Sequence, residues 1–284
     1  MTPTRKPRRR QWPIHIGLVI VTALTVYPIL LVIGIALSPR TGFQGVVSPI
    51  PDEPTVQNFI DVMTASTDQG EWLFGPQLVN SVVVSLATTV VGIFLATTAA
   101  YAFSRARFPG RRLGLMAFLV SQMFPGVLMM IPLYGLLGDM GLLNESLGLI
   151  LVYATTAIPF CVWMLKGYFD TIPRELEESA MMDGASQFTI FWKIMLPLSL
   201  PAIAVTALFS FMTAWNEFVL AYTFTSEPTA YTLPVAVQGY VGKVDIDWPR
   251  FAAASVLISL PVMALFFKLQ KYLVGGLTAG GVKG

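Results

Sequence analysis

Six long stretches of the chain are apolar and free of charged residues, and polar segments separate them. These uncharged runs are Ile14–Leu37, Leu78–Phe103, Leu113–Gly138, Ser146–Leu165, Ile194–Asn216 and Phe251–Phe267. A helix needs about 20 apolar residues to cross a hydrocarbon core about 30 Å thick. The last run is shorter, but Lys268 and Lys271 can lay their aliphatic stems along it and place their ammonium groups at the interface. The pattern predicts six spans, at about 14–37, 78–103, 113–138, 146–165, 194–225 and 251–272.

Proline and glycine occur inside these runs, where a soluble helix would seldom carry them. Membrane helices tolerate both residues, because neighbouring helices satisfy the carbonyl groups that they free. We expect them to mark kinks or close helix contacts at Pro28, Gly92, Pro125, Pro132, Pro159, Pro201 and Pro261. The single cysteine, Cys161, excludes an intramolecular disulfide and is expected only to pack within the fourth span.

Composition separates the chain from soluble globular proteins. Of its 284 residues 55% are apolar and only 12% are charged, against about 25% charged residues in soluble domains. The basic N-terminal segment precedes an apolar run that is longer than the roughly 7–15 residues of a signal peptide, so we expect it to be retained. The predicted fold class is an all-α integral membrane protein of one domain, 1–284, with periplasmic loops at about 38–77 and 226–250.

The distribution of basic residues predicts the orientation of the spans. With a cytoplasmic N-terminus, fifteen of the eighteen Lys and Arg residues fall on the inside, and only Arg40, Lys243 and Arg250 fall on the outside. Basic residues accumulate on the cytoplasmic side of membrane proteins. Both termini are therefore expected in the cytoplasm, and the Arg-rich N-terminus is explained by orientation and not by nucleic-acid binding.

One inside segment, at about 170–197, is too polar to span a membrane and too regular for a simple connection. It reads as two short helices. Pro173 suits a first helical turn, and the acids of 175–178 favour the positive end of a helix dipole. Gly184 is expected to end this helix with a positive φ. Ile172, Leu176 and Ala180 have the spacing of one apolar face.

The second helix of this segment is expected to begin at Ser186, whose hydroxyl suits an N-cap. Its aromatic and apolar residues follow the spacing i, i+3, i+4, i+7, which predicts a single apolar face made of Phe188, Phe191, Trp192 and Met195. The segment is thus predicted to be an amphipathic helix–turn–helix tied to two spans. Such an element can transmit the movement of a soluble partner, because packed helices shift as units.

The same segment resembles the EAA loop of bacterial ABC-importer permeases. That pattern is EAA, three residues, G, nine residues and I-x-L-P. It is matched by Glu178–Ala180, Gly184 and Ile194–Pro197, with Ser179 in place of the second-position alanine. The stretches Ala214–Phe224 and Gly276–Gly284 resemble the carbohydrate branch of this family, the MalG-type permeases of maltose/maltodextrin importers.

The resemblance implies a function and a set of partners. The chain is expected to be a non-catalytic permease subunit that carries maltose, maltodextrin or a related oligosaccharide such as trehalose across the inner membrane of a prokaryote. Its partners would be a MalF-like second permease, a MalK-like ATPase dimer, an extracytoplasmic sugar-binding protein and membrane lipid, and no nucleic acid. No cofactor is expected in this chain, since ATP and Mg²⁺ would be bound by the ATPase.

The resemblance also implies roles for single residues. Those expected to couple to the ATPase are Glu178, Ser179, Ala180, Asp183, Gly184, Ala185, Ile194, Leu196 and Pro197. The tail expected at the ATPase interface is Gly280, Gly281, Val282, Lys283 and Gly284. The outside-loop residues expected to meet the binding protein are Gln238, Gly239, Tyr240 and Gly242.

Trp215, Asn216 and Glu217 are candidates to line the pore, although Glu217 can equally be an interfacial acid. The alternative function is a free-standing secondary transporter, which would need an intramembrane coupling site of its own. The sequence contains no G-x-x-x-x-G-K-[ST] phosphate loop, no metal-ligand spacing and no nucleophile elbow. ATP hydrolysis by a phosphate loop of this chain is thereby excluded.

Overall fold

The computed structural model describes the backbone of residues 12–39, 49–241 and 246–280, and side chains as far as residue 270. Within these ranges the chain is helical and has no strand, only two isolated bridges, Ser66 with Trp72 and Val241 with Ile246. The all-α class is therefore confirmed. The chain divides into two packed units, unit 1 with residues 1–65 and 239–257 and unit 2 with residues 66–238 and 258–284.

Among the described residues, four helices are long and apolar enough to cross a bilayer. They are α1 (Trp12–Ala36), α3 (Phe74–Arg105), α6 (Ser146–Thr171) and the first 23 residues of α13 (Trp248–Gly280). These helices coincide with the expected spans 14–37, 78–103, 146–165 and 251–272. Pro28, Pro159 and Pro261 lie inside α1, α6 and α13 and do not end them, which agrees with the tolerance of membrane helices for proline.

The third expected span, 113–138, is broken. α4 (Arg111–Met123) is followed by η2 (Gly126–Met129) and α5 (Met130–Asp139), and the two halves meet at 91°. The break falls at Phe124, whose backbone is extended (φ −77°, ψ 127°). The residue before a proline is pushed out of the helical region by the pyrrolidine ring. Pro125 therefore accounts for the break, which falls at a position where the sequence predicts a kink; the bend is too sharp for a single continuous helix.

The fifth expected span, 194–225, is also not one helix. Residues Gln187–Leu198 and Leu200–Trp215 meet at 76°, with Pro201 in the first turn of the second part. The chain leaves the helix again after Trp215. The elements in order are α8 (Gln187–Ile190), the π-helical turn η3 (Phe191–Met195), α9 (Leu196–Leu198), α10 (Leu200–Trp215) and α11 (Val219–Phe224). The described residues thus contain four spans, or six if each bent pair is one span.

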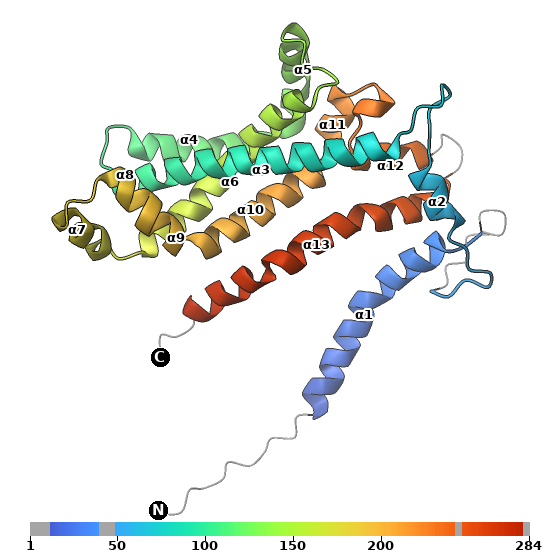
Figure 1. Cartoon of the computed structure of the whole chain (residues 1–284), viewed down its shortest axis with the longest axis horizontal. Helices are drawn as coiled ribbons and strands as arrows, with labels where there is room; N and C mark the ends of the chain where they lie inside the picture. Colours follow the sequence, from blue (N-terminus) through green and yellow to red (C-terminus); the bar gives the residue numbers. More distant parts are fainter. Residues whose placement is uncertain (1–11, 40–48, 242–245, 281–284) are drawn as a thin grey trace, which may run out of the picture. The chain divides into compact units, whose positions relative to one another are not determined.

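The core of unit 2 lies where α3, α6 and α10 pack along one another (Figure 1). Ala96 and Ala100 of α3 and Cys161 of α6 are fully buried at this contact. Small residues let membrane helices approach closely, and dispersion then replaces the hydrophobic effect as the source of stability. Cys161 is a free, buried thiol, as its predicted packing role requires. The same buried cluster continues to Phe169 and Met195, so it also supports the predicted helix–turn–helix.

Unit 1 joins the end of α1 to the short helix α2 (Gln57–Met63) and the beginning of α13. The Asn58 side-chain amide donates to the carbonyl oxygens of Ala36 at 2.8 Å and Ser38 at 2.9 Å, groups that the end of a helix leaves without partners. Arg250 donates to Asp61, with Nη2 2.6 Å from Oδ2. Side chains thus position α2, whereas α1 exposes most of its apolar surface on all sides, as a lipid-facing helix does.

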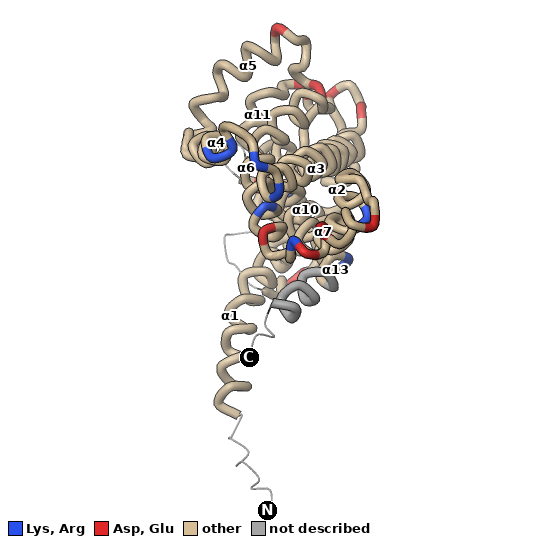
Figure 2. The backbone as a smooth tube through the Cα atoms, turned by 90° about the vertical axis from the view of Figure 1, so that its left-hand side faces the viewer, with Lys and Arg blue, Asp and Glu red and all other residues tan. Residues whose placement is uncertain are grey.

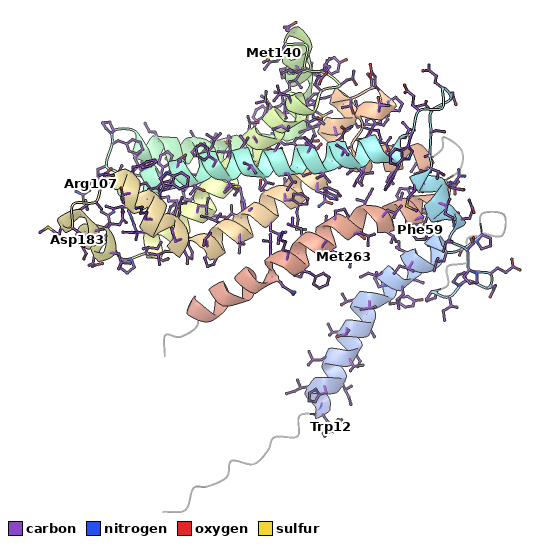
Figure 3. All side chains as sticks on the ribbon, in the orientation of Figure 1. Trp12, Phe59, Arg107, Met140, Asp183 and Met263 are labelled. Carbon is purple, nitrogen blue, oxygen red and sulfur yellow. The ribbon has the colours of Figure 1, made fainter. Side chains whose placement is uncertain are left out.

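Charge is distributed unevenly over unit 2. Basic residues gather where α4 begins beside α6, and acids mark the region of α5 and α11 as well as the first turn of α7 (Figure 2). Figure 3 places Arg107 and Asp183 at the same end of this unit, away from Met140. We call this the basic end of unit 2; it contains Arg105, Arg107, Arg111, Arg112 and Lys166. It is the end that the predicted topology assigns to the cytoplasm; the orientation itself stays a prediction.

Candidate functional site

The helix–turn–helix predicted at 170–197 is formed at the basic end of unit 2. Its first helix, α7 (Glu175–Met182), has three acids in the first turn, as expected. Gly184 has a φ of +84° and ends it. The amide of Gly184 donates to the Met181 carbonyl at 3.0 Å, and that of Ala185 to the Ala180 carbonyl at 2.9 Å. This is the Schellman arrangement, in which a left-handed residue satisfies the last carbonyls of a helix. The predicted helix stop and positive φ are confirmed.

The second helix begins at Ser186, whose Oγ accepts a hydrogen bond from the Thr189 amide at 3.2 Å. The predicted N-cap is confirmed, but the predicted single apolar face is wrong. Phe191 and Met195 are buried, whereas Phe188 is 73% and Trp192 46% exposed. The chain forms a π turn over 191–195, and i to i+5 bonding widens the turn and moves residues off the face expected of an α-helix.

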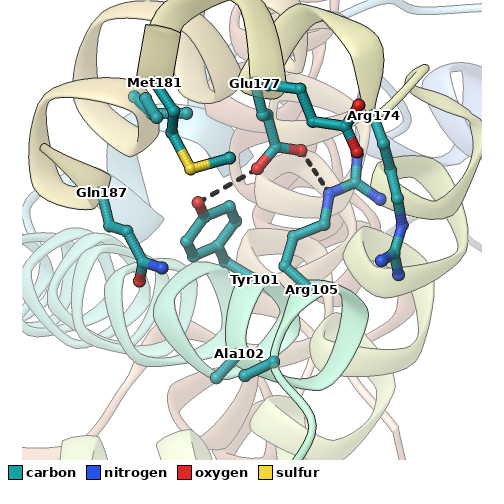
Figure 4. Close-up of a pocket in the computed structure, with 10 residues that line it drawn as sticks. Tyr101, Ala102, Arg105, Arg174, Glu177, Met181 and Gln187 are labelled. Carbon is teal, nitrogen blue, oxygen red and sulfur yellow. Dashed lines mark hydrogen bonds and ion pairs between the residues drawn. The ribbon is translucent and has the colours of Figure 1, made fainter. Parts of the chain in front are cut away.

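Glu177 connects this helix–turn–helix to α3. Its carboxylate forms an ion pair with Nε of Arg105 and accepts a hydrogen bond from the hydroxyl of Tyr101 at 3.2 Å (Figure 4). Tyr101 and Arg105 lie one turn apart on α3, so both reach the same carboxylate. Glu177 is buried, with 7% of its surface exposed. We call these three residues the Glu177 anchor.

A second set of polar contacts joins the ends of α3 and α6 beside the anchor. Arg105 Nη2 donates to the carbonyl of Ile172 at 2.8 Å. Asp170 accepts from the Ser104 hydroxyl at 2.6 Å and from the Lys166 ammonium at 2.5 Å. Arg105 therefore contacts both the end of α6 and the start of α7. The helix–turn–helix is attached to its own subunit by charged hydrogen bonds, the stronger class of such contacts.

Aromatic packing around the Tyr101 ring also supports the anchor. The Tyr101 ring lies 4.9 Å from that of Phe191 and 6.2 Å from that of Phe169, measured between ring centroids. Tyr101 thus contacts the second helix with its ring and the first with its hydroxyl. Aromatic pairs at these separations add about 0.5–1.5 kcal/mol beyond the area that they bury. Both helices of the segment are therefore held to α3 by one side chain.

The opposite side of the segment is exposed. A hollow of about 290 Å³ lies between α3 and the two helices, and the Glu177 anchor lines it together with Met181 and Gln187 (Figure 4). Glu178 is also on its wall. Beyond it, Met182 is 89% exposed, and Phe188 and Trp192 are exposed as noted above. Large apolar side chains next to an acid at the polar end of a membrane protein are typical of a surface that binds another protein. We call Glu178, Met182, Phe188 and Trp192 the outer face.

The residues predicted from the EAA pattern fall into two groups. Four pack partly buried against the core cluster: Ala180, Ala185, Ile194 and Leu196. The others are exposed: Glu178, Ser179, Asp183, Gly184 and Pro197. The Ser179 hydroxyl donates to the Glu175 carbonyl at 2.7 Å. Glu177, Arg105 and Tyr101 were not predicted. The available signal was the spacing of Tyr101 and Arg105, which places two donors on one helix face.

The three candidates for the pore lie in different surroundings. Trp215 is 1% exposed and stacks on Phe211, with ring centroids 5.4 Å apart, so its indole faces the interior of unit 2. Asn216 is exposed and donates to its own helix. Glu217 is half-buried and accepts from the Tyr153 hydroxyl at 2.7 Å.

Glu217 also accepts from two backbone amides at the start of α11, those of Leu220 at 2.9 Å and Ala221 at 3.0 Å. The first amides of a helix have no partner within it, and a carboxylate is well suited to bind them. Glu217 therefore stabilises the break between α10 and α11. Sequence reasoning could not find this role, because it requires the helix to stop at Trp215.

The predicted tail and outside loop are described only in part. Gly280 is the last residue of α13, and Gly281, Val282, Lys283 and Gly284 lie outside the described residues. Gln238, Gly239 and Tyr240 form the short 3₁₀ turn η5, and Gly242 lies outside the described residues.

A protein-family model described as "Binding-protein-dependent transport system inner membrane component" matches residues 78–278. The chain belongs to this family. It is 38% identical over 297 aligned positions to the "Maltose/maltodextrin transport system permease protein MalG" of Vibrio vulnificus, with 100% of this chain and 99% of that protein covered. It is 40% identical to the "Galactooligosaccharides transport system permease protein GanQ" of Bacillus subtilis, with 95% and 94% covered. The MalG-type, carbohydrate-branch resemblance of the sequence is thereby confirmed.

A solved structure supports the same fold. The chain matches one in the "Crystal structure of a bacterial ABC transporter involved in the import of the acidic polysaccharide alginate" with a TM-score of 0.78 and 22% identity. The match covers 96% of this chain and 100% of the other. At this identity the likeness establishes the fold alone. Together with the family, it makes the chain a multi-pass component of an inner-membrane transport system.

Proposed function

We propose that this chain is the permease subunit of a binding-protein-dependent importer that carries a carbohydrate across the cytoplasmic membrane. The support is its membership of the transport family and its likeness, over nearly the whole chain, to permeases named for maltodextrin and for galactooligosaccharides. The proposed cargo is maltose, maltodextrin or a related oligosaccharide such as trehalose. The chain crosses the membrane six times, with each bent helix pair counted as one span, and both termini lie in the cytoplasm.

The observation that carries the mechanism is the two-sided construction of the α7–α8 segment. Its inner side is attached to α3 by the Glu177 anchor. Its outer face is exposed in the described part of the chain and is therefore accessible to a partner protein. A MalK-like ATPase dimer, which binds ATP and Mg²⁺, docks on the outer face. When the dimer closes on ATP, it moves α7 and α8, and the attached helices α3, α6 and α10 move with them because packed helices shift as rigid bodies.

The remaining partners complete the importer. A MalF-like second permease supplies the other half of the pore. The residues Gly280–Gly284 enter the interface of the ATPase dimer. The outside-loop residues Gln238, Gly239, Tyr240 and Gly242 contact a sugar-binding protein on the other side of the membrane and displace its ligand. This chain binds no cofactor and contributes no catalytic residue.

The alternative, a secondary transporter, has less support. It needs an ionisable group within the membrane that is available to bind the coupling ion. Glu217, the only acid in the sequence of the six expected spans, accepts hydrogen bonds from Tyr153 and from two amides of α11. A carboxylate with three donors of this kind serves to hold α11 in place.

Uptake into membrane vesicles that contain the chain with its co-expressed second permease and ATPase distinguishes the two functions. Radiolabelled maltose, maltotriose and trehalose are supplied with their binding protein, with and without ATP on the cytoplasmic side, and with and without a protonophore. We expect uptake to require ATP and to persist when the proton gradient is collapsed. Uptake without ATP that the protonophore abolishes would establish the secondary transporter instead.

A further inference from the structure

A second hollow lies at the basic end of unit 2, apart from the outer face. It has a volume of about 550 Å³ and lies between the loop that joins α3 to α4, the first turn of α4 and the end of α6. Its wall combines cations with apolar groups: Phe108, Gly110, Arg111, Arg112, Leu113, Leu115 and Lys166. The proposed coupling mechanism uses none of these side chains.

The cations of this hollow are held in place and remain able to bind an anion. Arg111 uses Nε to donate to the Phe103 carbonyl at 2.8 Å, which fixes its guanidinium and leaves both terminal nitrogens without a partner in the described chain. Arg112 is exposed and forms no hydrogen bond or ion pair with any described residue. Lys166 is paired with Asp170 at 2.5 Å. Three cations and one acid leave the group with a net charge of +2.

The apolar half of the wall continues onto a helix that has no buried residue. Leu113 is 71% and Phe108 40% exposed, and none of the side chains of α4 is buried. The backbone turns toward the hollow at Gly110, where φ is +83°. No side chain caps the first amides of α4, and such amides attract an anion. A ligand that fits must therefore carry a phosphate-like anion at one end and hydrocarbon at the other.

We propose that this hollow binds the headgroup of an anionic phospholipid, whose acyl chains lie along α4. The cations stand at the end of two apolar helices, the end that the predicted topology assigns to the cytoplasmic membrane surface. The charge of +2 complements the single charge of phosphatidylglycerol or the two charges of cardiolipin. The bidentate geometry of guanidinium groups suits phosphate oxygens. A free inorganic anion would use the cations and leave the apolar wall bare, which makes a lipid the better occupant.

The hollow also borders the polar contacts that hold the helix–turn–helix to α3 and α6. Asp170, which pairs with Lys166, accepts a hydrogen bond from Ser104, and Ser104 accepts one from Arg105 of the Glu177 anchor at 3.2 Å. A lipid phosphate that attracts Lys166 competes with Asp170 for it. This part rests on the proposed function, whereas lipid binding itself does not. The two are distinguishable because binding is measured without transport.

Native mass spectrometry of the full-length chain, purified with the subunits that remain bound to it, tests the proposal. Dioleoyl phosphatidylglycerol or dioleoyl phosphatidylcholine is added in matched amounts. We expect one phosphatidylglycerol to be retained preferentially, and binding to fall about fivefold in Arg112→Gln and about 25-fold in Arg112→Gln/Lys166→Gln, since each cation near a lipid surface contributes about that factor. Arg107→Gln is the matched control, because Arg107 lies on the same loop and does not line the hollow.

Three results would overturn the proposal. Equal retention of phosphatidylcholine would make the hollow an apolar groove without headgroup selectivity. Displacement of phosphatidylglycerol by inorganic phosphate at equal concentration would make it a free-anion site. An equal loss in Arg107→Gln and Arg112→Gln would reduce it to general charge attraction. Arg112 is exposed and forms no hydrogen bond or ion pair with a described residue, so Arg112→Gln alone tests binding even if the Lys166 substitution disturbs folding.

Discussion

The carboxylate of Glu177 in α7 and the guanidinium of Arg105 at the end of α3 form an ion pair that both residues bury, with 9% and 11% of their side chains exposed. The pair joins segments that are 72 positions apart in the sequence. It explains why a polar loop at the edge of a membrane protein has a fixed orientation. The following predictions test this contact and the residues around it.

Replacing Glu177 should detach the helix–turn–helix from α3. We expect Glu177→Ala to cost about 3–5 kcal/mol of stability, since it leaves the Arg105 guanidinium buried without its partner. The measurements are the thermal unfolding of the purified chain and its co-purification with the ATPase. Glu175→Ala removes an exposed acid from the same helical turn and is the matched control.

A second pair of variants tests whether the two charges at positions 105 and 177 are needed, or only a well-packed pair of side chains. Glu177→Leu and Arg105→Met should each be unstable, but the double variant should recover most of the loss, because an apolar pair of similar size often replaces a buried ion pair without cost. Unfolding midpoints of the four proteins form a double-mutant cycle. Additive losses would show that the ion pair does not stabilise the segment.

Gly184→Val should misdirect α8 relative to α7. A Cβ at this position meets no atom within 4 Å, so the cost comes from the φ of +84° alone and should be about 1–3 kcal/mol. We expect normal insertion with reduced sugar-stimulated ATP hydrolysis in membranes of equal permease content. Asparagine tolerates a positive φ better than valine does, so Gly184→Asn should retain most of the activity. Wild-type hydrolysis in the valine variant would show that the turn does not set the coupling geometry.

Reversing the charge of Glu178 should weaken assembly and leave the fold intact, because this carboxylate is exposed and forms no described ion pair. In Glu178→Lys we expect wild-type unfolding and less co-purified ATPase. Higher salt should restore part of the assembly, since it screens an exposed repulsion. Measuring both thermal unfolding and ATPase co-purification distinguishes this variant from Glu177→Ala, which should lower both the stability and the amount of co-purified ATPase.

Glu217 should matter for structure and not for ion coupling. Glu217→Ala removes the acceptor of two amides and of the Tyr153 hydroxyl, and each buried donor left without an acceptor costs about 1–3 kcal/mol. Glu217→Gln keeps one carbonyl oxygen and should lose less. Differential scanning fluorimetry checks the order of stability, wild type above Gln above Ala. Uptake that requires a proton gradient in the wild type and no longer requires it in Glu217→Gln would assign the residue a coupling role instead.

Removal of residues 277–284 tests the proposed role of the tail. We expect the truncated chain to insert and bind the ATPase normally but to stimulate less ATP hydrolysis in the presence of sugar and binding protein. The measurement compares stimulated with basal hydrolysis in the same vesicles. Full stimulation by the truncated complex would make the tail dispensable for coupling.

The sequence predicted those parts of the site that depend on neighbours in the chain. The turn at Gly184 and the cap at Ser186 require only a glycine and a hydroxyl at the right places, and both are confirmed. The Glu177 anchor depends on a residue far away in the sequence. Three acids in one turn are equally well explained by the helix dipole, so nothing local distinguishes Glu177 from Glu178.

The same distinction applies to the spans. Apolar composition located the four long apolar helices and the two bent helix pairs, because transfer into hydrocarbon depends on composition and length. It did not reveal the bends, since an uncharged stretch remains apolar whether or not its backbone is straight. Pro125 was expected to kink a helix, but a bend of 91° depends on how α4 and α5 pack after the break. The π turn at 191–195 likewise has no signature in the spacing of apolar residues.

The attachment of α7 to the last turn of α3 makes α3 a lever. The helix has 32 residues, so it is about 48 Å long at about 1.5 Å per residue. A tilt of about 10° imposed at the Arg105 end would move the Phe74 end by about 8 Å, most of the roughly 10 Å width of a helix. In the proposed importer, a displacement small enough to leave the Glu177 ion pair unbroken would thus be amplified along the helix into one large enough to open or close a passage for a sugar.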